Sequence, residues 1–177
     1  MKLNDTREIK ADPATVWQAI LDPDVLRECI PGCESLTGSI ADGFEAAVVQ
    51  KVGPVKARFS GVVHLTDIDE GRSVRISGEG KGGAAGFAKG GAVVTLDPIP
   101  EGTRLTYEVE ASVGGKIAQL GSRIIDGFAK KMADDFFTRF QDAVEGPEET
   151  DLLAAAESAV DSVAEKKKGW FKRLIGG

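Results

Sequence analysis

Residues 114–144 read GGKIAQLGSRIIDGFAKKMADDFFTRFQDAV, and this stretch decides the fold. Its large apolar side chains recur at steps of three and four, the spacing of one helix face: Ile117, Leu120, Ile124, Phe128, Met132, Phe136 and Phe140. The pattern predicts one long helix over roughly residues 115–144. Gly121 and Gly127 lie inside it, and each costs on the order of 1 kcal/mol relative to alanine. We therefore expect both positions to need room for a neighbouring strand or a ligand.

The sequence before this helix alternates between apolar and polar residues, as β-strands do. In VKARFSGVVHLTDID (55–69), one face carries Val55, Ala57, Phe59, Val63 and Leu65. Turns that contain glycine separate such runs, and TRLTYEVEASV (103–113) is the last of them. Alternation of this kind is typical of an antiparallel sheet with one face in water.

Two short helices come before these strands. Asp12 is a good N-cap and Pro13 suits the first helical position, so a helix should begin here and end at Pro23. A second helix is expected over roughly residues 23–29, and a short strand over residues 3–10 opens the chain. The predicted order is thus one strand, two short helices, about six strands and one long helix.

A curved sheet and a helix with one apolar face bury both apolar surfaces when the sheet wraps around the helix. We therefore predict an α+β helix-grip (START-like) fold, with a curved antiparallel sheet wrapped around a long C-terminal helix, in a domain over residues 1–146. If the sheet does not close completely on the helix, an apolar cavity remains between them. Such cavities are the default ligand sites of proteins.

An acidic linker and a basic, flexible or amphipathic tail are expected in residues 147–177. The net charge of −6 disfavours nucleic acid as a partner. The chain nevertheless ends in KKKGWFKRLIGG (166–177), where apolar residues share one side of a helical wheel and Lys172 and Arg173 lie outside it. This composition favours an anionic membrane surface; the alternatives are a groove on a partner protein and a solubilising tail. The predicted membrane-binding residues are Lys166, Lys167, Lys168, Trp170, Phe171, Lys172, Arg173, Leu174 and Ile175.

Two motifs resemble the family of the carbon monoxide dehydrogenase G subunit. VWQAILDPDVLRECIPGCESL (16–36) is similar to the family's opening, in which W-x₃-L/I-x-D-P precedes L-x-x-C-I-P-G-C. GGKIAQLGSRIIDGFAKKMADDFF (114–137) is similar to the family's long-helix motif. The resemblance covers roughly residues 1–144. It places the chain in the START-like, or polyketide cyclase-like (SRPBCC), superfamily and implies the same helix-grip fold.

The resemblance also implies a function. It suggests a non-catalytic accessory protein that recruits an aerobic molybdenum hydroxylase, such as CO dehydrogenase, to the cytoplasmic membrane. It further implies a quinone or lipid carried in the cavity, with no covalently bound cofactor. Because the chain opens without an apolar run, we expect a cytoplasmic protein at the inner face of the membrane. The alternatives are a recruitment scaffold without a ligand and a START-like cyclase or hydrolase.

Candidate ligand contacts lie on the apolar faces of the predicted elements. The predicted set is Trp17, Phe59, Tyr107, Leu120, Ile124 and Phe128. The hydroxyl of Tyr107 is available either to the carbonyl of a quinone or, as in an ordinary core tyrosine, to the backbone. No inward pair of acid and base stands out, so no catalytic residue is predicted.

The remaining reactive residues do not form a recognisable site. Three residues separate Cys29 from Cys33, whereas redox and zinc motifs have two between their cysteines. His64 is the single histidine, so no metal site is predicted. GEGKGGAAGFAKGG (78–91) matches neither of the usual phosphate-binding patterns. It predicts a hairpin whose glycines allow tight curvature or leave space at the mouth of a cavity.

Overall fold

The structure is a computed structural model that describes residues 1–146. Its elements in chain order are β1 (Lys2–Ile9), α1 (Pro13–Leu21), α2 (Pro23–Cys29), β2 (Cys33–Ser39), β3 (Gly43–Val52), β4 (Val55–Asp69), β5 (Ser73–Lys81), the 3₁₀ turn η1 (Gly83–Ala85), β6 (Phe87–Ile99), β7 (Gly102–Gly114), the 3₁₀ turn η2 (Ile117–Leu120) and α3 (Ser122–Glu145). Met1–Val144 form one unit, and Glu145–Gly177 are divided from it. The domain boundary at residue 146 stays a prediction.

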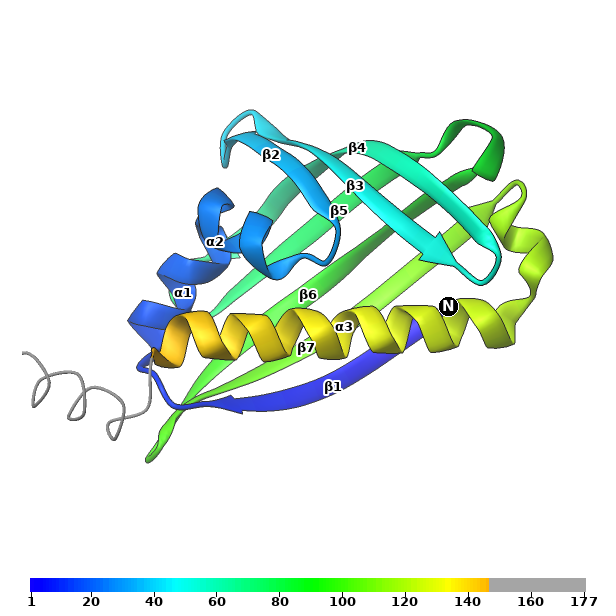
Figure 1. The fold of residues 1–177 in the computed structure, drawn as a ribbon. Helices are drawn as coiled ribbons and strands as arrows, with labels where there is room; N and C mark the ends of the chain where they lie inside the picture. Colours follow the sequence, from blue (N-terminus) through cyan, green and yellow to red (C-terminus); the bar gives the residue numbers. More distant parts are fainter. Residues whose placement is uncertain (147–177) are drawn as a thin grey trace, which may run out of the picture. The chain divides into compact units, whose positions relative to one another are not determined.

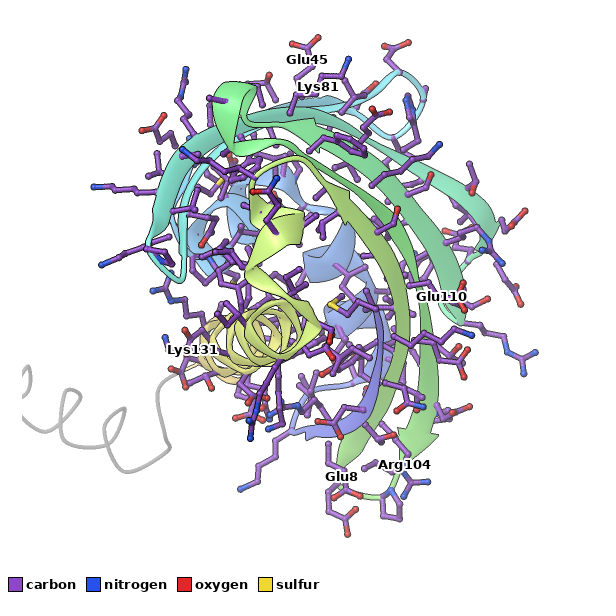
Figure 2. The ribbon with its side chains drawn as sticks, turned by 90° about the vertical axis from the view of Figure 1, so that its right-hand side faces the viewer. Glu8, Glu45, Lys81, Arg104, Glu110 and Lys131 are labelled. Atoms are coloured by element: carbon purple, nitrogen blue, oxygen red, sulfur yellow. The ribbon has the colours of Figure 1, made fainter. Side chains whose placement is uncertain are left out.

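The strands of this region form one antiparallel sheet in the order β1-β7-β6-β5-β4-β3-β2. Strands that follow one another in the chain are neighbours, except that β1 pairs with β7 and places Thr6 opposite Thr106. The sheet curves around α3 (Figure 1). Figure 2 looks nearly along the axis of α3 and shows the strands bending around it. The predicted α+β helix-grip fold is confirmed.

Both short helices begin where their capping residues predict. The side chain of Asp12 accepts a hydrogen bond from the backbone N–H of Thr15, and α1 starts at Pro13. Asp22 ends α1 and caps α2 through the backbone N–H of Asp24. These caps satisfy N–H groups that have no partner inside the helix. The two helices are joined without a loop and cover one end of the sheet (Figure 1).

The long helix starts later than the sequence predicts. The apolar spacing predicts a helix over residues 115–144, but α3 begins at Ser122, and Ile117–Leu120 form a separate 3₁₀ turn. The two segments are divided at Gly121, whose φ of +90° is one that residues with a side chain rarely adopt. A Cβ atom added at Gly121 or Gly127 would meet nothing within 4 Å. The expectation that these glycines make room for a neighbouring strand is therefore wrong, and room for a ligand stays a prediction.

Only the C-terminal half of α3 is packed firmly. Phe140 is fully buried, whereas Ile124 near the start of the helix is 42% exposed. The same half is tied to β1, because Arg7 pairs with Asp134 at 2.5 Å and Gln141 Nε2 donates to the backbone oxygen of Glu8 at 3.0 Å. The N-terminal half of α3 is therefore packed less closely against the sheet than the C-terminal half is.

The outer face of the sheet carries charged side chains. Glu8 pairs with Arg104 at 3.5 Å, and Lys2 pairs with Glu110 at 3.2 Å, in both cases with well-exposed side chains. Figure 2 shows Glu8, Arg104 and Glu110 pointing away from the helix. Such exposed pairs contribute little to stability, but they show that this face is turned to water. The inner face carries the buried apolar residues of the sheet, among them Val94, Leu96 and Leu105.

Candidate ligand cavity

A cavity of about 1010 Å³ lies between α3 and the inner face of the sheet. Side chains from all seven strands of the described chain, from α1 and α2, and from η2 and α3 line it. Ligand pockets typically measure about 300–1,000 Å³, so this cavity is at the upper end of that range. The space is too large for the ordinary packing defects of a protein interior.

Small residues meet across the middle of the sheet, and the alanines among them, Ala46, Ala88 and Ala111, line the cavity. In one row, Ala46 of β3 is opposite Gly61 of β4, which pairs with Gly80 of β5, which pairs with Ala88 of β6. In the neighbouring row, Gly78, Gly90 and Ala111 follow one another across β5, β6 and β7. Where the inner face carries no large side chain, a helix above it cannot fill the gap.

Aromatic rings close the cavity toward the C-terminal half of α3. The rings of Phe136 and Phe137 meet edge to face with centroids 5.0 Å apart, and both residues line the cavity. The ring of Tyr107 on β7 stacks on that of Phe137, and the guanidinium of Arg7 lies over Phe137, 5.6 Å from its centroid. This end of the cavity is therefore a fixed wall.

The hydroxyl of Tyr107 belongs to a polar cluster at the edge of that wall. It lies near the side chain of Arg7, which donates a hydrogen bond to Asp134. Burial raises the pKa of the Tyr107 hydroxyl, and the nearby guanidinium of Arg7 opposes that change. The hydroxyl thus has a charged side chain beside it, where the sequence offered the backbone or a quinone carbonyl.

The opposite end of the cavity is more polar. Among the described residues that line it, the polar side chains are those of Tyr107, Ser112, Ser122 and Asp126. Ser122 and Asp126 are one helical turn apart on α3 and therefore share a face. Both are exposed, so they lie where the cavity meets solvent.

The structure brings two of the six predicted ligand contacts to the cavity. Tyr107 and Phe128 are among its walls. Trp17 is 7% exposed inside the main core. Phe59 and Leu120 pack in a second cluster around Val52, Ala85 and Ile117. Ile124 is 42% exposed. Its side chain lies beside Gly53 in the β3–β4 turn, where an added Cβ atom would be 3.5 Å away from it.

The role of these six residues as ligand contacts stays a prediction. Sequence reasoning missed the small wall residues and Asp126. The inward positions of β5 to β7 were available from the strand alternation, and they supply Ile76, Ala92 and Val109 to the walls. The predicted membrane-binding residues lie outside the described residues.

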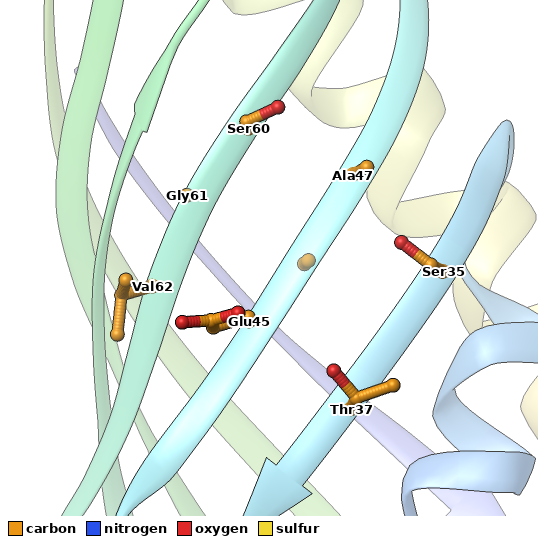
Figure 3. A pocket seen from close by; sticks show the side chains of 8 residues that line it. Ser35, Thr37, Glu45, Ala47, Ser60, Gly61 and Val62 are labelled. Carbon is orange, nitrogen blue, oxygen red and sulfur yellow. The ribbon is translucent and has the colours of Figure 1, made fainter.

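A second, shallower hollow of about 390 Å³ lies over β2, β3 and β4. Figure 3 shows its lining, in which Ser35 and Thr37 come from β2, Glu45 and Ala47 from β3, and Ser60 and Val62 from β4. The small side chains of one row, Ser35, Ala47 and Ser60, are paired across the strands and make the surface concave. No sequence motif marks this hollow.

The reactive residues set aside in the sequence do not gather in the structure. Burial raises the pKa of the thiols of Cys29 and Cys33, which keeps them in the unreactive thiol form. The Sγ of Cys33 donates a weak hydrogen bond to the oxygen of Ser35 at 3.4 Å. Within residues 1–146, no group of three His, Cys, Asp or Glu residues is placed to hold a metal. No helix in the same region is long and apolar enough to cross a membrane.

A curved antiparallel sheet that grips one long helix, with an apolar cavity between them, defines a helix-grip protein of the START-like class. The family model of the carbon monoxide dehydrogenase G subunit (CoxG) matches residues 6–145. The chain therefore belongs to the CoxG family, as the two sequence motifs suggested.

Solved structures agree with this assignment. A conserved protein from Geobacillus kaustophilus is 34% identical, with a TM-score of 0.76 over 82% of this chain and 95% of that chain. Protein CV1439 from Chromobacterium violaceum is 18% identical, with a TM-score of 0.61 over 82% of this chain and 99% of that one. TTHA0849 from Thermus thermophilus is 17% identical, with a TM-score of 0.60 over 81% and 97% of the two chains. The latter two share the fold alone. No curated protein matches the sequence.

Proposed function

We propose that this protein is a non-catalytic accessory protein of an aerobic molybdenum hydroxylase of the CO dehydrogenase type. It recruits that enzyme to the inner face of the cytoplasmic membrane and holds a quinone or a similar hydrophobic molecule in its cavity. The observation that carries the proposal is the cavity of about 1010 Å³ with mostly apolar walls. The description of the family supports the choice of enzyme partner.

The chemistry of the walls favours binding over catalysis. Among the described lining residues, Asp126 is the single carboxylate, and none is a histidine, lysine or cysteine. General acid–base chemistry needs a proton donor and an acceptor placed together, whereas the two candidates in these walls, Tyr107 and Asp126, lie toward opposite ends of the cavity. Transfer of an apolar molecule from water into the cavity is favourable by about 25 cal/mol for each Å² buried. This gain suits a hydrophobic carrier.

The attachment to the membrane rests on the sequence of the tail. Residues 166–177 combine five cations with Trp170, Phe171, Leu174 and Ile175. Each cation near an anionic leaflet contributes about 1 kcal/mol, and salt weakens that contribution. A tether of this kind is reversible, which allows the protein to release the membrane.

The test of the carrier role is mass spectrometry of organic extracts from the purified protein, with the full chain and with residues 147–177 removed. A quinone or other lipid retained by both forms supports a ligand held by residues 1–146. If neither form retains a hydrophobic molecule, the carrier role is wrong and a recruitment scaffold without a ligand remains.

Membrane attachment has a separate test in sedimentation with vesicles that contain anionic lipid. Replacing Trp170 and Phe171 by alanine should abolish co-sedimentation. The matched control replaces Leu152 and Leu153, two apolar residues of the tail outside the basic segment, and should sediment as the unaltered chain does. Equal sedimentation of both variants would exclude the basic segment as the tether.

A further inference from the structure

The polar groups of the cavity are not equally available to a ligand. The hydroxyl of Tyr107 lies beside the charged side chain of Arg7, and the Oγ of Ser112 donates to the backbone oxygen of Lys89 at 3.5 Å. Ser122 and Asp126 have no side-chain hydrogen bond or ion pair within residues 1–146. The polar side chains of the cavity that have no partner in this region therefore lie on one face of the first turns of α3.

Asp126 differs from the neighbouring acidic residues of the same helix. Asp134 is bound by Arg7 and Lys130, and Asp135 pairs with Lys131 at 3.1 Å. Asp126 has no such cation within the described residues and lies in the rim of a cavity whose other walls are mostly apolar. Because Asp126 is exposed at the rim and has no side-chain partner in this region, its carboxylate is available to a polar group of a molecule that enters the cavity.

A carboxylate accepts hydrogen bonds and donates none. It therefore attracts a hydroxyl group and repels a carbonyl oxygen that offers the same lone pairs. The hydroxyl of Ser122, one helical turn earlier, can donate or accept a hydrogen bond, so it can bind either kind of head and leaves the selection to Asp126. Deeper in the cavity, Ile20, Leu26 and Ile30 at the α1–α2 end offer only apolar side chains. The two ends thus suit an amphiphile with a polar head at α3 and an apolar tail beyond it.

We infer that Asp126, with Ser122, forms the headgroup site of the cavity and selects a ligand whose head carries hydroxyl donors. Applied to a quinone carrier, the site prefers the reduced hydroquinone to the oxidised quinone. The two forms share one carbon skeleton and one tail and differ at the head, where hydroxyl groups replace carbonyl groups. This inference rests on the proposed carrier function and specifies which form of the ligand the cavity holds more tightly.

The experiment measures binding of one short-tailed isoprenoid hydroquinone and of its oxidised quinone to the full-length protein, without oxygen, by equilibrium dialysis. We expect the hydroquinone to bind about tenfold more tightly, as one hydrogen bond to a charged group allows. Asp126→Asn should bring the ratio of the two affinities to about one, because an amide can also donate to a carbonyl. Asp142→Asn is the matched control on the same helix, since Asp142 is exposed and is not among the described wall residues, and should keep the ratio.

The outcomes separate the two proposals. If the unaltered chain binds both forms equally, or if Asp126→Asn keeps the preference, the headgroup site is wrong while the carrier function stands. If neither form binds to the unaltered chain, the quinone carrier function fails and the headgroup site fails with it. A second readout is the double variant Ser122→Ala and Asp126→Asn, which should bind the oxidised form no more weakly than the unaltered chain does.

Discussion

The ring of Tyr107 stacks on the ring of Phe137 with centroids 4.7 Å apart and planes 17° from parallel. This contact joins β7 to α3, and it lies at the boundary between the solid core and the open cavity. On one side of it, Phe140 is fully buried. On the other side, Phe128 is only half-buried and borders empty space. One helix therefore serves as core and as cavity wall.

This division predicts that a phenylalanine-to-alanine substitution lowers the free energy of unfolding by different amounts at two places on α3. Phe137→Ala removes the stacked ring and a buried side chain and should lower the free energy of unfolding by about 3–5 kcal/mol. Phe128→Ala removes a ring that already borders a cavity and should cost about 1–2 kcal/mol. Urea unfolding with the m-value compared between variants measures both. Equal losses would mean that the two ends of α3 are packed alike.

A loss of stability in acid should depend on Asp134. The hydrogen bond from Arg7 lowers the pKa of the Asp134 carboxyl. Because the folded-state pKa lies below that of the unfolded chain, about 3.9, this contribution is complete above that value and disappears as the pH falls through the folded-state pKa. Asp134→Asn should therefore reduce the difference in stability between pH 7 and pH 3, measured by urea unfolding.

Part of the acid sensitivity should remain in that variant. Hydrogen bonds from the side chain and backbone of Thr15 lower the pKa of Asp12, so this carboxylate has a dependence of the same sign. Asp12→Asn combined with Asp134→Asn should reduce the difference in stability between pH 7 and pH 3 further. If Asp134→Asn alone leaves the profile unchanged, the Arg7–Asp134 contact does not hold in solution.

The two glycines near the start of α3 should respond in opposite directions to alanine. At Gly127 an added Cβ meets nothing within 4 Å, so Gly127→Ala should stabilise the protein by about 0.5–1 kcal/mol through its higher helix propensity. Gly121 has a φ of +90°, so Gly121→Ala should cost about 1–3 kcal/mol. Thermal unfolding distinguishes them, and a loss of stability in Gly127→Ala would show that this turn of the helix is crowded.

Filling the cavity should remove the ligand without harming the fold. Ala92 of β6 lines the cavity, and its register partners Ile76 and Val109 line it too. Ala92→Leu should leave the stability unchanged or higher and should reduce the hydrophobic material in organic extracts. Val93→Leu, on the outer face of the same strand, is the control. A loss of about 1–3 kcal/mol in Ala92→Leu is the mark of an already filled core and would exclude the cavity.

Most of the architecture could be predicted because its signals are periodic and long. The alternation in residues 55–69 gives β4 its inner face, with Val63 and Leu65 on the cavity wall. Capping by Asp12 places the start of α1. The start of α3 could not be predicted because apolar spacing continues through Gly121, whereas the backbone at that residue leaves the helix. A spacing pattern reports side chains and carries no information about φ.

The cavity walls were harder to predict for a physical reason. Large aromatic residues are natural candidates for ligand contacts, but such residues fill space, and Trp17 does so in the core. The sheet wall of the cavity includes small residues instead, such as Ala88 and Ala111, which are paired with Gly80 and Gly90 on the neighbouring strands. That coincidence depends on strand register. The sequence contains each glycine but does not show which of them meet.

The pairing of β1 with β7 has a consequence for the protein during its synthesis on the ribosome. Thr6 and Thr106 touch across these strands although they are 100 positions apart in the chain. At about 5–20 residues per second of synthesis, the first strand leaves the ribosome roughly 5–20 seconds before its partner. During that interval the nascent strand has both edges open to other chains. Its sequence KLNDTREI is dense in charge, a property that discourages association with foreign strands until the last strand and helix arrive.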